Sequence, residues 1–294
     1  MKLASNLVLL GVLFFVVWPV QGQTPTTAVD YNNRGVDRQN AGDLDGAIAD
    51  YTKAIEIDPR YRDAYNNRGT SRATKGDLDG AIADYTKGLE IDPHSAMAYY
   101  GRGVVRQAKG DLDGAIADYN RAVEIDPLNA PAYYNRGNGR QAKGDLDGAI
   151  ADLTKAIEID PRKAEAYNNR GVARQAKGDL EGAIADWNKA VEINPGIPGA
   201  YGALAWLLAT SPKDSIRDGK RAVEYARKAA ELAKWEDANT LDTLAAAYAE
   251  AGNFAEAIRW ENKALSFQEY AKSDGDEARK RLQLYQAGKP YHEK

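Results

Sequence analysis

Few side chains in this sequence have the type and spacing that covalent or metal chemistry requires. The chain contains no cysteine and two histidines, His94 and His292, which lie far apart. A Ser-His-Asp triad needs a histidine base beside the serine, and many zinc sites use clusters of histidine and cysteine. Neither arrangement can be built from sequence neighbours. We therefore predict that the protein is not an enzyme and uses no metal or other cofactor, and we interpret both histidines as ordinary surface residues.

A repeated Asp-Leu-Asp-Gly motif is the next candidate for a chemical site, because closely spaced aspartates can bind calcium. Its first copy begins at Asp43 and ends at Gly46. A calcium-binding EF-hand loop needs glycine at its sixth position and glutamate at its twelfth. Here glycine is fourth and the twelfth residue is Ala54. The motif instead predicts helix capping, since an aspartate at a helix start accepts hydrogen bonds from free backbone N–H groups.

These motifs belong to a repeat with a period of 34 residues. The period is marked by five prolines, Pro59, Pro93, Pro127, Pro161 and Pro195. A fixed period of this length indicates supersecondary units that bury their apolar faces by stacking on one another. We therefore expect five regular units within residues 30–197.

Each unit has the sequence pattern of two helices. In the second unit, apolar residues recur at helical spacing on both sides of Gly76. Gly76 suits the left-handed turn that ends a first helix, and Asp77 is placed to cap the second. Pro93 disfavours helical backbone at Asp92, so it is expected to end the pair.

The unit resembles the tetratricopeptide repeat (TPR) family. That family has large residues at places four and twenty-four, small residues at places eight, twenty and twenty-seven, and proline at place thirty-two. In the third unit these places are held by Tyr99, Tyr119, Gly103, Ala115, Ala122 and Pro127. The resemblance covers about residues 30–270. It implies an all-α fold, a right-handed α-solenoid of stacked antiparallel helix pairs with a C-terminal capping helix. It also implies a protein-binding function.

Outside the regular units, the pattern predicts four further segments. Residues 198–270 read as two divergent TPR-like units, and residues 271–294 as the capping helix and a tail. Residues 1–22 have a charged start and a short apolar run typical of a secretory signal peptide, followed by a short linker at 23–29. The alternative is a retained membrane anchor, although a span needs about 20 apolar residues. We expect an exported protein, periplasmic or extracellular, or alternatively one that is N-terminally membrane-anchored.

Arginine at place seven and aspartate at place twenty-three occur together in all five regular units. The TPR family commonly has leucine at place seven, and the divergent units carry Leu204 and Leu244 there. We hypothesise that each aspartate pairs with an arginine of its own or an adjoining first helix, with a structural role. The residues are Arg34 and Asp50, Arg68 and Asp84, Arg102 and Asp118, Arg136 and Asp152, and Arg170 and Asp186.

The opposite face of each first helix, at places five, nine and twelve, lines the concave peptide-binding groove in the family that this chain resembles. Here that face is uncharged and rich in amides, which can bond the backbone of a ligand. Tyr100 and Tyr134 are the candidate central anchors. The alternative interpretation is that the amides simply face solvent. The other candidate groove residues are Asn32, Asn66, Asn138, Asn168, Gln107, Gln141 and Gln175.

Two functions remain open from the sequence. The first is a scaffold that binds peptide or protein partners in the groove without catalysis. The second is an accessory or regulatory subunit that docks onto an enzyme or envelope assembly through the divergent units, where Trp206, Trp235 and Trp260 could form a surface. The basic residues with which some TPR proteins hold a chaperone's terminal carboxylate are missing. With a net charge of −4, nucleic acid is not an expected partner, and a membrane is one only if residues 1–22 remain as an anchor.

Overall fold

The computed structural model describes residues 25–293, and that range contains sixteen α-helices and no strand. The helices are α1 (Ala28–Asn40), α2 (Leu44–Ile57), α3 (Arg62–Thr74), α4 (Leu78–Ile91), α5 (Ala96–Ala108), α6 (Leu112–Ile125), α7 (Ala130–Ala142), α8 (Leu146–Ile159), α9 (Ala164–Ala176), α10 (Leu180–Ile193), α11 (Pro198–Thr210), α12 (Gly219–Leu232), α13 (Ala238–Glu250), α14 (Phe254–Leu265), α15 (Gln268–Ser273) and α16 (Gly275–Gln286).

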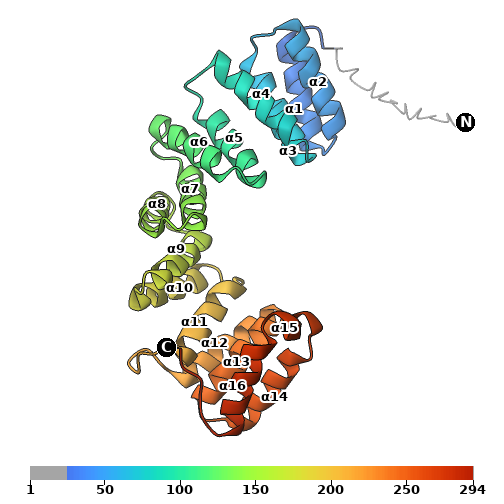
Figure 1. The fold of residues 1–294 in the computed structure, drawn as a ribbon. Coiled ribbons are helices and arrows are strands. Elements are labelled where there is room, and N and C mark those ends of the chain that lie inside the picture. Colours follow the sequence, from blue (N-terminus) through green and yellow to red (C-terminus); the bar gives the residue numbers. More distant parts are fainter. Residues whose placement is uncertain (1–24, 294) are drawn as a thin grey trace, which may run out of the picture.

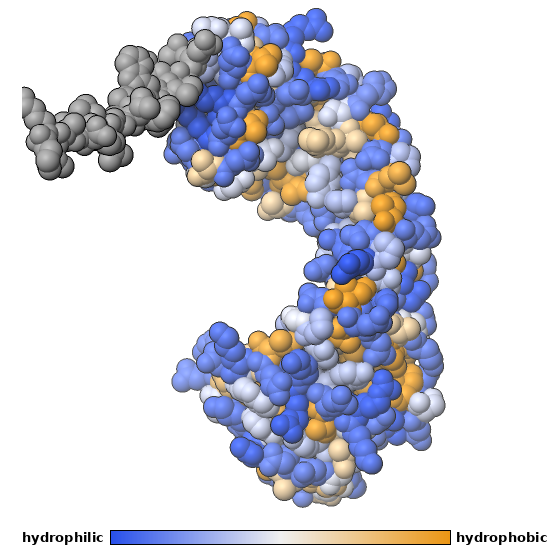
Figure 2. Space-filling view, turned by 180° about the vertical axis from the view of Figure 1, so that it is seen from behind, coloured by the Kyte–Doolittle hydropathy of each residue, from blue (hydrophilic) through white to orange (hydrophobic). Residues whose placement is uncertain are grey.

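The helices form antiparallel pairs that stack in chain order and curve into an open arc (Figure 1). Helices α1 to α10 make the five regular units, and α11 to α16 make what we call the divergent end. Consecutive first helices, such as α3, α5 and α7, also contact one another across the units. They therefore line the inner side of the arc, which is open to solvent (Figure 2). The predicted all-α solenoid of stacked helix pairs is confirmed.

Local sequence explains where the helices of a unit begin and end. Gly76 has a φ of +87°, a left-handed conformation that glycine adopts without strain. The side chain of Asp77 then accepts a hydrogen bond from the backbone of Gly80 and caps α4. The helix ends before Asp92, whose backbone is extended as expected for a residue that precedes proline. The repeated Asp-Leu-Asp-Gly motif is thus a helix cap.

The core of each regular unit combines small residues with one large side chain. In the third unit, Tyr119 on α6 is fully buried against Gly103 on α5. A Cβ atom at Gly103 would lie 2.7 Å from the tyrosine ring, so the two helices can approach this closely only because that residue is glycine. Leu153 and Trp187 take the place of this tyrosine in the fourth and fifth units and are also fully buried.

The boundaries of the units differ slightly from those expected. Helix α1 begins at Ala28, within the expected linker 23–29, because Thr27 forms a capping box with Asp30. At the other end, α15 spans the expected boundary between residues 270 and 271, and α16 is the expected capping helix. The predicted signal peptide, residues 1–22, lies outside the described residues. None of the helices between residues 25 and 293 is long and apolar enough to span a membrane.

Candidate functional site

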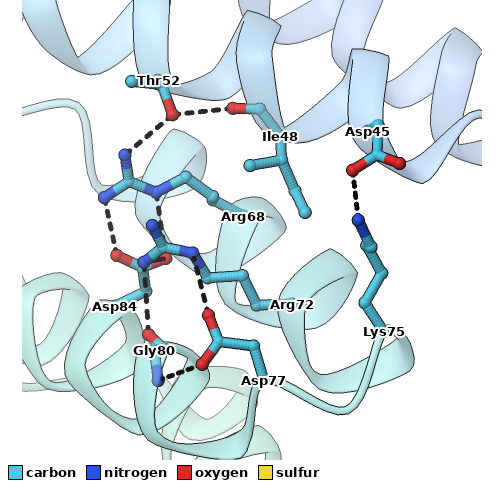
Figure 3. A network of polar contacts seen from close by, with 9 residues as sticks. All are labelled: Asp45, Ile48, Thr52, Arg68, Arg72, Lys75, Asp77, Gly80 and Asp84. Carbon is cyan, nitrogen blue, oxygen red and sulfur yellow. Dashed lines mark hydrogen bonds and ion pairs between the residues drawn. The ribbon is translucent and has the colours of Figure 1, made fainter.

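The structure places each repeated aspartate between two arginines of its own unit. Asp84 on α4 accepts hydrogen bonds from Nε and Nη2 of Arg68, at 2.9 and 2.7 Å, and from Nη1 of Arg72 at 2.8 Å (Figure 3). The aspartate is 3% exposed, whereas the two arginine side chains are 13% and 27% exposed. Such fork-shaped, charge-assisted contacts tie the first helix of the unit firmly to the second.

The place-seven arginine of each regular unit after the first also contacts the preceding unit. Nη1 of Arg68 donates to the hydroxyl of Thr52 at 3.0 Å, and that hydroxyl donates to the carbonyl of Ile48 (Figure 3). The same contact is made by Arg102 with Thr86, Arg136 with Asn120 and Arg170 with Thr154, over 2.8 to 3.0 Å. The chain of contacts therefore runs from one unit to the next.

All five predicted arginine–aspartate pairs are formed within their own units. The shortest distances are 2.5 Å for Arg34–Asp50, 2.7 Å for Arg68–Asp84 and Arg102–Asp118, 2.5 Å for Arg136–Asp152 and 2.6 Å for Arg170–Asp186. Arg34 has no preceding unit to cover it, and its side chain is 39% exposed. Its hydrogen bond to Asp50 raises the pKa of the guanidinium above the ordinary value.

A second, exposed set of ion pairs joins neighbouring units and was not expected from the sequence. In each pair a lysine after a first helix contacts an aspartate at the start of the preceding second helix. Figure 3 shows one of them, Lys75 with Asp45. The other three are Lys109 with Asp79, Lys143 with Asp113 and Lys177 with Asp147. Because the aspartates are more than 80% exposed, these pairs contribute little to stability.

The predicted groove residues lie on the first helices, and several are held by hydrogen bonds between units. Asn32 is buried and accepts a hydrogen bond from the amide of Asn67 at 3.0 Å. The hydroxyl of Tyr100 accepts from Asn135 at 3.2 Å. Burial raises the pKa of the Tyr100 hydroxyl, so it stays protonated at neutral pH. These contacts fix the side chains of Asn32 and Tyr100 in position.

The same inter-unit contact joins the fourth and fifth units. The amide of Asn169 donates to the hydroxyl of Tyr134 at 3.1 Å and to Asn138 at 2.9 Å. An asparagine at place six thus bonds the residue at place five of the preceding unit in three of the junctions. This residue was not singled out in the sequence, although its recurrence as Asn67, Asn135 and Asn169 would have been a usable signal.

At two further junctions, place five of the preceding unit holds an asparagine but place six of the next unit does not, and both leave an amide oxygen unpaired. Place six holds Gly101 in the third unit and Ala203 in the sixth. The Oδ1 atoms of Asn66 and Asn168, at place five of the preceding units, are buried and have no hydrogen-bond partner among residues 25–293. A side chain cannot be added easily at Gly101, because its Cβ would lie 2.7 Å from the ring of Tyr85.

The gap at Gly101 opens a mainly apolar hollow of about 400 Å³ between α3 and α5. Tyr85 forms its floor, and Met97, Tyr100 and Val104 stand along its side. Met97 is 76% exposed and Val104 is 39% exposed. Exposed valines also occur on α1 and α9, at Val29 and Val172, but α5 has two exposed apolar side chains beside one hollow. Such a surface can be covered by another molecule.

The glutamines of the groove have different surroundings. Gln107 accepts a hydrogen bond from the buried hydroxyl of Tyr119 at 2.9 Å and so supports the core. Gln141 lines a second hollow of about 410 Å³ with Asn138 and Val172. Gln175 is half-buried on α9. The predicted residues therefore lie along one continuous wall, but they divide between packing and an accessible surface.

The divergent end contains a buried charged cluster that the sequence did not reveal. Arg281 on α16 contacts Asp242 on α13 at 2.8 Å, and its Nε lies 3.6 Å from Glu261 on α14. Neither oxygen of the fully buried Glu261 has a hydrogen-bond partner in the described part of the chain. Burial, together with the nearby charge of Asp242, raises the pKa of Glu261 to about 10, so this carboxyl is protonated at neutral pH.

Comparison with protein families identifies the repeat. Models of the tetratricopeptide repeat match residues 40–76, 69–110, 107–139, 140–178, 164–197 and 238–269. The chain belongs to the tetratricopeptide repeat family, as its sequence pattern predicted. Comparison with curated protein sequences gives no match.

Three solved structures illustrate the similarity. MamA is 31% identical, with a TM-score of 0.53 over 55% of this chain and 94% of MamA. YrrB, described as a TPR protein with an unusual peptide-binding site, is 28% identical, with a TM-score of 0.54 over 60% of this chain and 91% of YrrB. PilF from Pseudomonas aeruginosa is 22% identical, with a TM-score of 0.63 over 78% of this chain and 97% of PilF. These proteins share the solenoid of helix pairs, and a role in protein interaction fits them.

Among residues 25–293, no group of three or more histidine, cysteine, aspartate or glutamate side chains is arranged to hold a metal ion.

Proposed function

We propose that this protein is a non-catalytic scaffold that binds an extended segment of a partner protein along the inner wall of its five regular units. The observation that carries the proposal is the hollow at Gly101, where exposed apolar side chains stand among fixed polar ones. An apolar side chain of the ligand would enter the hollow, while its backbone would bond the surrounding amides. A similar structure, YrrB, is described as a TPR protein with an unusual peptide-binding site, and this also supports a peptide-binding role.

The absence of charged residues at the groove-lining places of the regular units also indicates which class of partner would bind there. Places five, nine and twelve of the regular units carry asparagine, glutamine, tyrosine, valine, threonine and alanine. A ligand held mainly by charge would need basic or acidic groups on this face. We therefore propose a partner segment whose apolar side chains and backbone make the contacts, and whose binding depends weakly on salt concentration.

Crosslinking in cells tests this function. A photoreactive residue at Tyr100 or Tyr134 is expected to capture a partner more efficiently than one at Trp235. Val104→Glu places a charge in the hollow and is expected to reduce capture at least about tenfold, the effect of burying one unpaired polar group. Leu128→Glu is the matched control, because Leu128 is an equally apolar, 73% exposed residue in the connection between α6 and α7. An equal loss of partner capture in both variants would contradict binding in the groove.

The divergent end supports a second function, docking onto an enzyme or an envelope assembly. Trp235 and Trp260 stack with ring centroids 5.2 Å apart, and they line a hollow of about 570 Å³ with Arg259 and Lys263. Tryptophan and arginine are frequent anchors of protein interfaces. Capture mainly through a photoreactive residue at Trp235 would favour this function over the groove.

We also propose that the scaffold acts outside the cytoplasm, on the basis of the charged start and apolar run of residues 1–22. Fractionation of cells that express the tagged chain tests this proposal. Recovery of a shortened chain in the periplasm or the medium would support it. A full-length chain in the cytoplasm would contradict it.

A further inference from the structure

The last described residues of the chain do not extend away from the solenoid. After α16, residues 288–293, which we call the closing segment, turn back and run without helical structure to α11 (Figure 1). Gly288 makes the turn with a φ of +67°. The backbone N–H of Glu293 then donates to the carbonyl of Thr210, at the end of α11, over 2.8 Å. The closing segment thus supplies a hydrogen bond to one of the carbonyls that a helix leaves free at its C-terminal end.

The side chains of the closing segment alternate between two helices. Tyr291 and Glu293 both contact Trp206 on α11: the Tyr291 and Trp206 rings lie 6.2 Å apart, and the indole N–H of Trp206 donates to Glu293 at 2.7 Å. His292 points to the neighbouring first helix, where its Nε2 lies 2.7 Å from Glu250 on α13. This alternation is the geometry of an extended chain. His292 is therefore part of a contact surface, contrary to the expectation of an ordinary surface residue.

The surface under the closing segment belongs to the inner wall. Helices α11 and α13 are the first helices of the sixth and seventh units, and they contact each other more extensively than consecutive first helices of the regular units do. Trp206 holds place nine of its unit, a groove-lining place in the other units. Arg281 completes the surface, with its guanidinium 5.6 Å from the Trp206 ring and 5.8 Å from the Tyr291 ring. The tyrosine is thus held by a cation and an aromatic ring.

We propose that the inner faces of α11 and α13 form a second binding site, for an extended peptide in which a tyrosine is followed two residues later by a glutamate, and that the closing segment occupies this site in cis. Each feature of such a peptide has a partner here. Its tyrosine meets Trp206 and Arg281, its glutamate meets the indole N–H, and its backbone N–H meets the Thr210 carbonyl.

This site regulates binding through competition. While the closing segment is bound, a peptide from another protein must displace it. The apparent affinity for that peptide is the intrinsic affinity of the site multiplied by the fraction of molecules whose site is empty. Since the segment is held only by a few polar contacts and by the packing of one side chain, Tyr291, an external peptide of the same chemistry can exchange with it. The inference goes beyond the proposed groove of the regular units and does not depend on it.

A peptide titration tests the site directly. The full chain carrying Tyr291→Ala and Glu293→Ala is titrated against a fluorescent peptide Gly-Lys-Pro-Tyr-His-Glu, the sequence of residues 288–293. Fluorescence anisotropy is expected to show binding at least about tenfold tighter than to the unchanged chain. A control peptide with alanine in place of its tyrosine and glutamate is expected to bind at least about tenfold more weakly. Equal affinities for the two chains, or for the two peptides, would overturn the proposal.

A second measurement leaves the closing segment intact and so does not depend on the folding of that variant. Because the chain has no cysteine, Lys289→Cys gives a single site for a fluorescent label on the exposed part of the segment. Excess unlabelled peptide is expected to release the segment and lower the anisotropy of the label, whereas unchanged anisotropy would count against exchange. Tyr100→Ala with Tyr134→Ala is expected to leave both results unaltered, which separates a failure of this site from a failure of the regular groove.

Discussion

The five regular units and the divergent end use different side chains to hold the two helices of a pair together. In the regular units, one buried aspartate and two arginines bridge the helices, and the remaining core consists of small residues and one large side chain. In the divergent end, leucine replaces the arginine at place seven, and Leu204, Leu207 and Leu244 are buried. A buried ion pair often gives no more stability than well-packed apolar residues. We therefore infer from the comparison that the charges serve specific pairing within and between units.

Of the changes that test this comparison, removing one buried aspartate is expected to have the largest effect on the free energy of unfolding. Asp118→Ala leaves Arg102 and Arg106 without their shared partner, which should lower the free energy of unfolding by about 3 kcal/mol or more. Urea denaturation followed by circular dichroism measures the loss. Asp113→Ala is the matched control, because Asp113 is exposed and pairs with Lys143 at the surface. It should cost less than about 1 kcal/mol. Similar losses in the two variants would show that the buried network is not stronger than a surface pair.

The buried cluster of the divergent end predicts a pH effect of intermediate size. Unfolded Glu261 releases its proton near its ordinary pKa of 4.5, whereas the folded chain keeps that proton up to about pH 10. Between these values the folded state binds more protons, so the free energy of unfolding falls as the pH rises. Glu261→Gln removes this loss. It should stabilise the chain by at least about 1.4 kcal/mol at pH 8, the equivalent of one pKa unit.

Thermal denaturation of Glu261→Gln and of the unchanged chain at pH 8 and pH 5 checks this prediction. The advantage of the glutamine variant should shrink toward pH 5, where glutamate is protonated in a growing share of unfolded chains. Glu256→Gln serves as the control, because Glu256 lies near the surface of the same helix. An advantage that is equal at both pH values, or a less stable glutamine variant at pH 8, would contradict the assignment of a protonated Glu261.

The smallest expected effect concerns the link between units. Thr86→Val removes the hydroxyl that accepts from Arg102 at 3.0 Å while keeping the shape of the side chain. It should cost about 1 kcal/mol, and the junction between the second and third units should open more readily. Amide hydrogen exchange of α5 measures that opening. In the control Thr74→Val, the hydroxyl that is lost bonds only its own helix, at the carbonyl of Thr70, so exchange in α5 should not change.

The fold could be predicted because its signals are periodic. The spacing of Pro93 and Pro127, together with the repeated turn at Gly76 and cap at Asp77, sets both helices of a unit and their order. The arginine–aspartate pairs were visible for the same reason, since two polar residues recur at places that the family fills with apolar ones. Their geometry within the unit matches what was hypothesised, while their contribution to stability awaits the Asp118→Ala measurement.

The remainder of the site depends on contacts that do not repeat. Gly101 is an exception to the asparagine that recurs at place six. The hollow beside it follows from the close approach of Tyr85 and not from a repeated motif. The cluster around Arg281 joins α13, α14 and α16, and the closing segment reaches α11 from more than 80 residues away in the sequence. Such long-range contacts occur once in the chain and leave no pattern to detect.

The contact from each place-seven arginine to the preceding unit has an evolutionary consequence. Because Arg102 and Arg170 contact a threonine at the same place of the preceding unit, duplication or loss of a block of 34 residues would preserve this arginine contact. At the boundary with the sixth unit, Leu204 replaces this arginine, and Tyr225 donates to Asn188 instead. The number of regular units could therefore change while this arginine contact is kept, whereas the divergent end is joined to the fifth unit by a different contact.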